Sequence, residues 1–569
     1  MRALLLTTIW LACTAAEASA ALLPGFHRSP WFQESVREAW LEGSVHAVMN
    51  VPADFDPAKP TRLVLFATPN GNTVEQTLGC RLEQGADWHV EIQHAAAQTR
   101  AWRRLNPEQN IVLACVAAEG LSWPSWRQAR KDNAAVIAKI VDTLRGWLPS
   151  KPTVTLACHS GGGSFLFGFI NSADAIPEWI DRIIFLDANY SYDDEQKHGD
   201  KLLAWLRGDA SRRLVVIAYD DREITLDGKK VVSETGGTFR ATGRMRTRLE
   251  NDLKFIEQQT GEFKTATALD GRLVFHVHPN PQNKILHTVM VGEMNGLLEG
   301  LSLGTDRRDW GSLAAPRAYS EFVQPAPGVP PRPADAPGGR AVMESVAHAS
   351  REAREQVLVQ AVLEGNVPEF LRTWTPVEVK WTDAAGKEHV AVYEVMPDYL
   401  AVGSDEDFVR IPISPQSAQT IADAFGAVLP TVKMVEDITK AAKVRLEPQP
   451  LTEDRDSVAA FLKSNGLIEE QRAEQTGLIA GIKKDVVLTN RLNEKANRVA
   501  IYGWHHRDGK PIQPLTIVHV NWYVDYSHGI RLVKRAMTVD GRPRDLKFLL
   551  HDAKLNSLMS DEGAIEAGY

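Results

Sequence analysis

The sequence predicts two globular domains: an α/β domain whose mostly parallel sheet is covered by helices, followed by a separate α+β domain. In the first half, short uninterrupted apolar runs alternate with segments of helical periodicity, which is the pattern of parallel strands buried on both faces. Between the halves, residues 321–340 are rich in proline and glycine, a composition that favours an extended spacer over a packed core. The predicted domains are therefore residues 21–320 and 341–569.

Composition limits the classes of protein and partner. A chain of 569 residues is too long for one ordinary core. The net charge of −8, with no lysine- or arginine-rich run, argues against nucleic acid as the main partner and leaves small molecules, glycans or proteins. Three cysteines follow the first twenty residues, Cys80, Cys115 and Cys158, too few for a disulfide framework. A Cys80–Cys115 pair is left open.

The N-terminus has the pattern of a secretory signal peptide. Residues 1–20 contain a basic Arg2, an apolar run and the small-residue ending Ala18-Ser19-Ala20. We expect cleavage after Ala20 and export to the periplasm or the medium. The apolar run is shorter than the ~20 residues that span a bilayer, and no later run is long enough, so no transmembrane segment is expected in the mature chain.

The elements expected in the first half follow one another as strands and helices. The expected strands are residues 44–51, 61–68, 111–118, 153–157, 182–187, 212–221 and 271–277, and the expected helices are residues 30–41, 88–104, 130–148 and 288–303. Each strand is a short apolar run, and each helix has apolar residues near helical spacing. In parallel sheets the chemistry gathers at the carboxyl ends of the strands, where polar residues follow these runs.

The second half mixes helical and strand-like segments without a pattern that identifies its fold. The expected helices are residues 341–364, 417–425 and 432–442, and the expected strands are residues 377–381, 390–396, 486–488, 499–504 and 516–526. No internal repeat relates this half to the first. It is predicted to be an accessory domain, either a binding module or a second enzyme acting on a linked substrate.

A serine is presented on a tight turn between a predicted strand and a predicted helix, in Cys158-His159-Ser160-Gly161-Gly162. Such a turn needs small residues on both sides of the serine, strains its backbone, and aims the following N–H groups at an incoming carbonyl. The motif resembles the nucleophile elbow of the α/β-hydrolase superfamily, with a cysteine where the family more often has glycine. A phosphate-binding βα turn and a buried serine without chemistry are the alternatives.

The resemblance covers residues 44–303 and implies acyl transfer to water through an acyl-enzyme, without metal or cofactor. A serine hydroxyl needs a base within hydrogen-bond reach, and the family keeps its histidine in the loop after the last strand. His287 occupies that place, just before the final helix. His278, at the end of the last strand, is the alternative.

Three aspartates are candidates for the acid that orients the histidine. Asp220 and Asp221 are the last two residues of the predicted strand segment 212–221. Of these two, the family's usual register favours Asp221. Asp187 ends the preceding strand, a position that some lipase-like members use. The aspartates that do not orient the histidine are expected to be turn residues at strand ends.

Two backbone donors are expected to stabilise the oxyanion of the tetrahedral intermediate. The N–H of Gly161, just after the serine, is one. The loop after the first strong strand should supply the other, and Asn70 and Gly71 lie there. The alternative for this pair is an ordinary Asn-Gly turn.

Two tryptophans follow the predicted strand 111–118 at its carboxyl end. Trp123 and Trp126 are therefore predicted to line the cleft, where aromatic faces stack on sugars or hold an aromatic acyl group. Core packing is the alternative interpretation.

The densest polar and aromatic stretch of the second half is residues 519–531. Within it, Ser527-His528-Gly529 is similar to the signature of L,D-transpeptidases, but Ile530 stands where their cysteine nucleophile would be, so that chemistry cannot run here. The histidines and acids of this region match no zinc spacing, and no metal site is predicted. These residues are His505, His506, His519, Asp525 and His528.

Together these features predict an exported serine hydrolase that cleaves a carboxylic ester of a small molecule or glycan, with a glycan or aromatic acyl substrate favoured by the tryptophans. One alternative is an amidase or peptidase with the same triad in the cell envelope. The other is a catalytically silent binding protein on a hydrolase scaffold.

Overall fold

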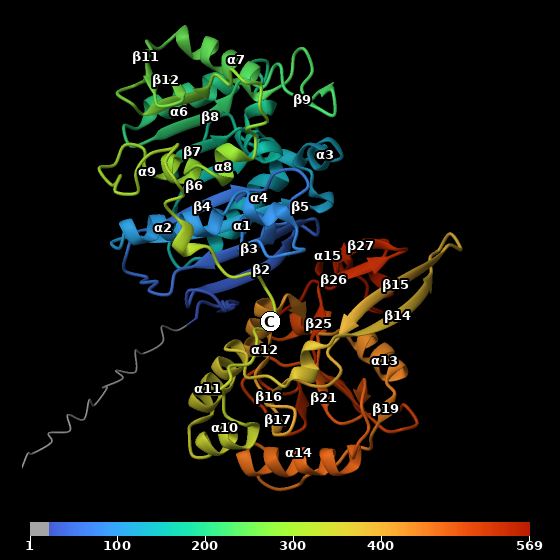
Figure 1. The fold of residues 1–569 in the computed structure, drawn as a ribbon. Helices are drawn as coiled ribbons and strands as arrows, with labels where there is room; N and C mark the ends of the chain where they lie inside the picture. The colour runs from blue at the N-terminus through green and yellow to red at the C-terminus, as the bar shows by residue number, and fades with distance from the viewer. Residues whose placement is uncertain (1–21) are drawn as a thin grey trace, which may run out of the picture.

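The computed structural model describes residues 22–569 (Figure 1). The chain forms two bodies, coloured blue to yellow-green and yellow to red, that lie against each other. The predicted signal peptide, residues 1–20, lies outside the described residues. Along residues 22–569, no helix combines the length and the apolar character needed to cross a bilayer.

Within the described chain, an 11-stranded sheet organises the first half, in the order β1-β2-β3-β5-β4-β6-β7-β8-β13-β12-β11. Its strands are β1 (His27–Arg28), β2 (Ser35–Leu41), β3 (Val45–Val51), β4 (Thr61–Ala67), β5 (Asn110–Ala118), β6 (Thr153–His159), β7 (Ile180–Leu186), β8 (Arg213–Tyr219), β11 (Ile256–Thr260), β12 (Phe263–Ala268) and β13 (Leu273–His278). The six strands from β5 to β13 in this order are parallel, and antiparallel strands extend both edges.

Helices cover both faces of this sheet. Each face has its own hydrophobic core, and neighbouring residues of a strand point into different cores. In β4, Leu63 and Leu65 pack into one core, whereas Val64 and Phe66 pack into the other. The first core is closed by α3 (Trp123–Gln128), α4 (Asn133–Gly146), α5 (Gly163–Ile170), α6 (His198–Gly208) and α7 (Thr238–Glu250), and the second by α1 (Val74–Leu78), α2 (Ala95–Leu105), α8 (Val289–Gly292) and α9 (Gly296–Ser302). The predicted mostly parallel sheet covered by helices is confirmed.

The helix predicted for residues 30–41 is wrong, because Ser35–Leu41 form strand β2. This strand pairs antiparallel with β3, from Ser35 opposite Val51 to Leu41 opposite Val45. Its sequence contains good helix formers, but the backbone pairing with β3 overrides that weak preference. Beyond the sheet, β9 (Thr225–Leu226) and β10 (Lys229–Lys230) form a small exposed hairpin after β8.

The second half has its own core and several small sheets. Its strands are β14 (Thr375–Thr382), β15 (Glu388–Val395), β16 (Ala401–Gly403), β17 (Phe408–Arg410), β18 (Ala427–Val428), β19 (Val444–Arg445), β20 (Ile479–Ala480), β21 (Lys484–Val486), β22 (Ile501–His505), β23 (Pro511–Thr516), β24 (His528–Gly529), β25 (Val533–Lys534), β26 (Ala536–Val539) and β27 (Arg542–Asp545). Its helices are α10 (Gly339–Ser345), α11 (Arg351–Leu363), α12 (Pro415–Phe425), α13 (Val432–Ala441), α14 (Val458–Arg472) and α15 (Leu546–His551). One large hydrophobic cluster joins them.

Between the two bodies, residues 323–338 contain neither helix nor strand. This segment is packed against the second half instead of hanging free. The Arg332 guanidinium donates to Asn366 Oδ1 and to the Gly403 carbonyl oxygen, both at 3.1 Å. Gly328 N–H donates to the Ala424 carbonyl oxygen at 2.8 Å. The proline-rich stretch is therefore held against the second half by hydrogen bonds.

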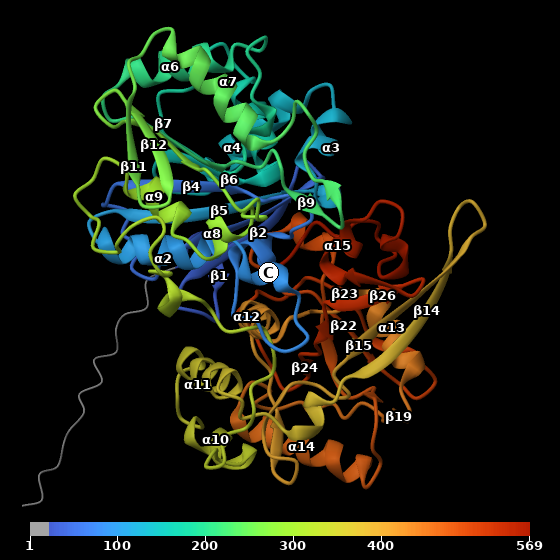
Figure 2. The same cartoon turned by 45° about the horizontal axis from the view of Figure 1, so that its top comes forward.

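The second half meets the first along β1 and β2 (Figures 1 and 2). Trp40 of β2 stacks on His551 of α15, with ring centroids 4.2 Å apart, and meets Phe548 edge-on at 5.4 Å. On the other side of this contact, Thr420 of α12 donates to the Arg28 carbonyl oxygen at 2.7 Å. The two halves thus share aromatic packing and hydrogen bonds.

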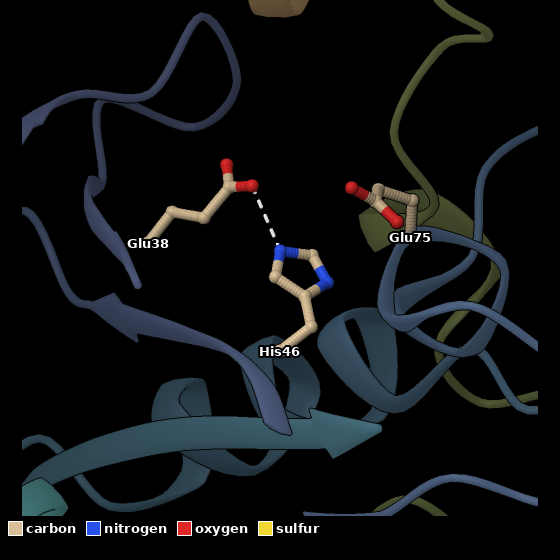
Figure 3. A group of neighbouring side chains, drawn as sticks. All are labelled: Glu38, His46 and Glu75. Atoms are coloured by element: carbon tan, nitrogen blue, oxygen red, sulfur yellow. Dashed lines mark hydrogen bonds and ion pairs between the residues drawn. The ribbon is translucent and has the colours of Figure 1, made fainter. Parts of the chain in front are cut away.

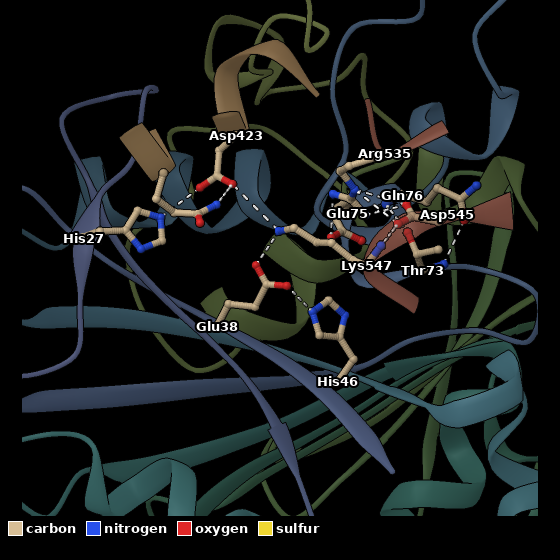
Figure 4. Close-up of polar contacts among 11 residues, drawn as sticks. His27, Glu38, His46, Thr73, Glu75, Gln76, Asp423, Arg535, Asp545 and Lys547 are labelled. Carbon is tan, nitrogen blue, oxygen red and sulfur yellow. Dashed lines mark hydrogen bonds and ion pairs between the residues drawn. The ribbon is translucent and has the colours of Figure 1, made fainter. Parts of the chain in front are cut away.

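Beside these rings lies a group of charged side chains that we call the interface cluster (Figure 4). Its members are His27, Glu38, His46, Glu75, Asp423, Arg535, Asp545 and Lys547. Lys547 Nζ lies 2.6 Å from Glu38 and 3.8 Å from Asp423. Arg535 lies 2.8 Å from Glu75 of α1 and 2.7 Å from Asp545. Cations of the second half thus bind carboxylates of the first.

Three members of the interface cluster, Glu38, His46 and Glu75, bring ligand-type atoms within 4.8 Å of one another (Figure 3). His46 Nε2 is hydrogen-bonded to Glu38 at 2.8 Å. The two carboxylates already face Lys547 and Arg535, whose charges would oppose a metal ion in the same space. We therefore treat these residues as part of the ion-pair network between the halves.

Candidate active site

The turn after β6 presents Ser160 in a strained backbone conformation. β6 ends at His159, a single 3₁₀ turn spans Ser160–Gly162, and α5 follows. Ser160 has φ of 53°, in the left-handed region that side chains rarely adopt. A Cβ on Gly161 would lie 2.1 Å from Asn70 Oδ1, and one on Gly163 would lie 1.6 Å from the Ala188 carbonyl oxygen. The glycines are therefore required by close approach on both sides of the turn.

A histidine and an aspartate from two other strand ends meet beside this turn. His287, in the loop after β13, places its Nδ1 2.5 Å from Asp187 Oδ2. Asp187 directly follows β7, is fully buried and has φ of 46°. Its other carboxylate oxygen accepts a hydrogen bond from the Thr238 hydroxyl. Both carboxylate oxygens of Asp187 are thus hydrogen-bonded, and the contact at Nδ1 orients the His287 imidazole.

The other two candidate aspartates make different contacts. Asp220 forms an ion pair with Arg222 at 2.6 Å, and the hydrogen bond from Arg222 lowers the pKa of its carboxyl. Asp221 accepts a hydrogen bond from Thr238 N–H at 2.7 Å. Burial, and then the neighbouring Asp187, raise the pKa of Asp221 to about 6. The preference for Asp221 as the orienting acid is thus corrected, because the structure pairs His287 with Asp187.

A buried hydrogen-bond chain holds the backbone of His287 in place. Asn72 donates to Gln93 Oε1 at 3.0 Å, so the Gln93 amide nitrogen faces His159 Nδ1, also at 3.0 Å. His159 Nε2 then lies 3.1 Å from the His287 carbonyl oxygen. Burial, and then His287, hold the pKa of His159 well below its usual value, so the ring is neutral and donates from Nε2.

The sequence pattern did not indicate this role of His159. Its partner Gln93 lies on the segment between η1 (Trp88–Glu91) and α2, far from the elbow in sequence. The adjacency of a histidine to the serine was the one available signal. The two rings, His159 and His287, lie 4.5 Å apart between centroids.

Of the residues expected to bind the oxyanion, Asn70 and Gly161 lie against each other, as the 2.1 Å approach of a Gly161 Cβ to the Asn70 side chain shows. Gly71 has φ of 83° and donates its N–H to the Leu121 carbonyl oxygen at 2.8 Å. That N–H is therefore committed elsewhere. In the described chain, the Asn70 N–H donates to no other group, so Asn70 and Gly161 are the remaining candidates.

The prediction that Trp123 and Trp126 line the cleft is wrong, because both are core residues. Trp123 is 1% exposed and packs edge-on against Phe165 at 4.6 Å. Trp126 is 6% exposed, and its indole N–H donates to Ser44 Oγ at 3.1 Å. The residues lie in α3, which follows β5 along the chain, but their rings are buried in the core.

The cysteines take no part in this site. Cys80, Cys115 and Cys158 are buried and free, so Cys80 and Cys115 are not paired in this structure. Burial raises the pKa of the Cys80 thiol to about 11 and that of Cys158 well above its usual value. Cys158 fills the space before the serine as a small apolar residue.

The strand order, with β3 antiparallel to the first of the six parallel strands, and the serine turn after the central strand β6 together define the fold. The acid after β7 and the histidine after β13 follow in the chain order of the family that the motif resembles. The first half has an α/β-hydrolase-like fold. This half ends near Val323, whose side chain still packs into its second core, and the second half has no counterpart in that arrangement.

No family model and no curated protein matches the chain. Among solved structures, it is similar to a thermostable esterase, with 15% identity and a TM-score of 0.26 over 42% of this chain and 51% of the other. It is also similar to a cold-adapted esterase from an Arctic intertidal metagenomic library (12% identity, 44% of this chain and 84% of the other, TM-score 0.25) and to the feruloyl esterase module of Clostridium thermocellum in complex with sinapinate (9%, 43% and 81%, 0.26). The chain matches about half the length of the first of these esterases.

Proposed function

We propose that this chain is an exported serine hydrolase that cleaves carboxylic esters through an acyl-enzyme. The observation that supports this most directly is the 2.5 Å contact between His287 and the buried Asp187, beside the strained turn that carries Ser160. Export rests on the signal-peptide pattern of residues 1–20. The chemistry requires no metal or cofactor.

In the proposed reaction, Ser160 Oγ attacks the ester carbonyl carbon while His287 Nε2 takes the hydroxyl proton. The Asp187 carboxylate accepts the Nδ1–H of His287, which fixes the tautomer with a lone pair on Nε2 and stabilises the imidazolium. The imidazolium then protonates the leaving alcohol. Water, deprotonated by the same nitrogen, hydrolyses the acyl-enzyme and restores Ser160.

The negative charge on the carbonyl oxygen needs fixed donors, and the N–H groups of Gly161 and Asn70 fit this role. Asn70 lies against the elbow glycine, and its N–H has no other acceptor in the described residues. The loss of one such donor typically costs ~10²–10³ in rate. Gly71 contributes its left-handed backbone conformation, φ of 83°, to the loop that brings Asn70 there.

The substrate is proposed only as a carboxylic ester. The argument for an aromatic acyl group or a glycan depended on Trp123 and Trp126, and both are buried in the core. Nothing else in the site favours an amide over an ester, so a peptidase or amidase is treated as an outcome of the test.

The test is labelling with a fluorophosphonate probe followed by peptide mapping, with Ser160→Ala as the control. We expect labelling of Ser160 alone, together with turnover of p-nitrophenyl esters. Turnover of matched anilides without esters would replace the esterase by an amidase. An unlabelled Ser160 in folded protein would favour a silent binding protein on this scaffold.

A further inference from the structure

One face of a small sheet in the second half gathers the polar and aromatic residues of the stretch 519–531. The sheet has the order β23-β22-β21-β24. Lys484 of β21 is the register partner of His528 of the parallel strand β24, so their side chains leave the sheet on the same face. His519 stacks on Tyr523 at 4.8 Å between centroids, and Tyr523 meets His528 edge-on at 5.9 Å.

This face holds several buried nitrogens without a hydrogen-bond partner in the described part of the chain. They are both ring nitrogens of His528, which is 1% exposed, the indole nitrogen of Trp504 and Nε of Arg455. Buried polar groups are nearly always hydrogen-bonded, since an unpaired one costs free energy comparable to a lost hydrogen bond. A neutral His528 ring donates from one nitrogen, so this ring, the indole and the guanidinium together present three N–H donors without an acceptor, which indicates an absent acceptor.

Lys484 adds an unpaired cation to the same face. Its side chain is 8% exposed and lies with Nζ 5.1 Å from the centre of the Trp504 ring. Within residues 22–569 its ammonium has no ion pair and no hydrogen bond. Burial lowers the pKa of Lys484, and the Asp525 carboxylate acts in the opposite direction without forming an ion pair with it.

The Asp525 carboxylate beside this face is already occupied. Asp525 accepts hydrogen bonds from Arg455 at 2.6 Å, from Tyr523 at 3.1 Å, and from the Ser527 hydroxyl at 2.5 Å and N–H at 2.8 Å. Asp525 and Arg455 cancel in charge, and burial lowers the pKa of His528 to about 4, so its ring is neutral near pH 7. A single positive charge, that of Lys484, remains.

We propose that this face is a binding site for one carboxylate group, formed by Lys484, His528 and Trp504, with Arg455 at its edge. The donors outnumber the acceptors, and the net charge of one matches a monoanion and not a dianion. The two oxygens of a carboxylate can accept from the ammonium and from the ring N–H groups at once. The half-buried His519 and Tyr523 rings form the rim over which the remainder of the ligand leaves. The site is independent of the hydrolase proposal.

The test is calorimetric titration of the full chain with acetate and with benzoate, in buffers matched in ionic strength with chloride. We expect both carboxylates to bind, with benzoate tighter because of the aromatic rim. Lys484→Met should weaken binding at least about 10-fold, the typical value of a hydrogen bond to a charged group. Lys443→Met, which removes an exposed lysine of the same half, should bind as the wild type.

A second measurement covers the case in which the variant is poorly folded. Because Lys484 is largely buried without an ion pair or a hydrogen bond in the described chain, Lys484→Met should melt at a higher temperature than the wild type when no ligand is present. Addition of carboxylate should raise the melting temperature of the wild type but not that of the variant. In NMR spectra of wild-type protein with 13C-labelled histidine, benzoate should shift the ring resonance of His528. The proposal would be overturned if phosphate bound and neither carboxylate did. It would also be overturned if no ligand bound beyond the chloride baseline, the result expected if water fills the site.

Discussion

Two buried carboxylates, Asp187 and Asp221, share the single residue Thr238. The hydroxyl of Thr238 donates to Asp187, and its N–H donates to Asp221 at 2.7 Å. Because both strand ends deliver an acid to the same place, the register of a sequence alone cannot decide which one meets His287. The geometry decides, and the two acids acquire different roles.

The first prediction separates these two acids. Asp187→Asn should reduce kcat by about 10⁴-fold, because an amide nitrogen facing His287 Nδ1 forces the wrong tautomer. Asp221→Asn keeps an oxygen for Thr238 N–H and should reduce kcat less than 10-fold, roughly the effect of a remote residue. Steady-state hydrolysis of a p-nitrophenyl ester measures both. A greater loss in the Asp221 variant would contradict the assignment of the acid.

The second prediction concerns the pH dependence of stability. Burial and Asp187 raise the pKa of Asp221 from 3.8 in the unfolded chain to about 6. Its protonated form therefore contributes stability that is fully present below pH 3.8 and is lost as pH rises through about 6. Asp221→Asn should raise the melting temperature at pH 8 and leave it nearly unchanged at pH 3.5. An equal shift at both pH values would exclude this titration as the cause.

At the scale of elements, the parallel strands were the most predictable part of the fold. β4 and β5 are continuous apolar runs with almost every residue buried, and such runs have few alternatives. β2 could not be predicted, because it is stabilised by its pairing with β1 and β3 and not by its own sequence. α14 has no apolar stripe, because Ser464 and Asn465 lie on its buried face whereas Leu462 and Leu467 are only partly buried, and it was missed for that reason.

The candidate site was predictable to the same extent. Asp187 and His287 follow strands that the periodicity located, so their contact at one edge of the sheet followed from the order of the strands. Trp123 and Trp126 lie where predicted along the chain, but the side of a turn on which a ring lies depends on tertiary packing. The Asn72–Gln93–His159 chain depends on loops with no periodic pattern.

The third prediction tests the packing of the elbow. Gly163→Ala places a Cβ against the Ala188 carbonyl oxygen, a clash that backbone atoms cannot relieve. It should destabilise the protein by about 3 kcal/mol or more, the upper range for overpacking a core. Gly146→Ala, at the end of α4 with open space around it, is the matched control and should leave stability unchanged or slightly higher.

Urea unfolding followed by circular dichroism measures both variants. If Gly163→Ala were as stable as Gly146→Ala, the elbow would not have the close approach between its first helical residue and the strand end after β7. The Ser160 label provides a second readout, since a relaxed turn would lose reactivity before it lost stability.

At the scale of the whole molecule, the interface cluster couples the two halves. Burial alone would raise the pKa of Glu38, but Lys547 and His46 outweigh it and hold that pKa well below its usual value. Burial also acts to raise the pKa of Asp423, but Lys547 and His27 outweigh it and lower that pKa. These acids contribute stability above their unfolded pKa values, and this contribution is lost as pH falls through the folded ones.

The fourth prediction follows from the position of Lys547 between two acids. Lys547→Met leaves Glu38 and Asp423 without their cation and should cost about 3–5 kcal/mol at pH 7. The difference from wild type should shrink as pH falls below about 4, where the freed carboxyls take up protons. Thermal melts at several pH values measure this, with the exposed Lys554→Met as control. A difference that stayed constant with pH would contradict the ion-pair account.

The contact between Arg535 and Glu75 limits how this protein can be shortened. Glu75 lies in the first turn of α1, only five residues after Asn70 in the loop proposed to bind the oxyanion. A first half produced alone would leave Trp40 and the acids of the interface cluster facing water, with nothing bracing the helix beside that loop. Gene fusion or fission at the proline-rich segment would therefore carry a penalty in activity as well as in solubility, so we expect the two halves to be inherited as one unit.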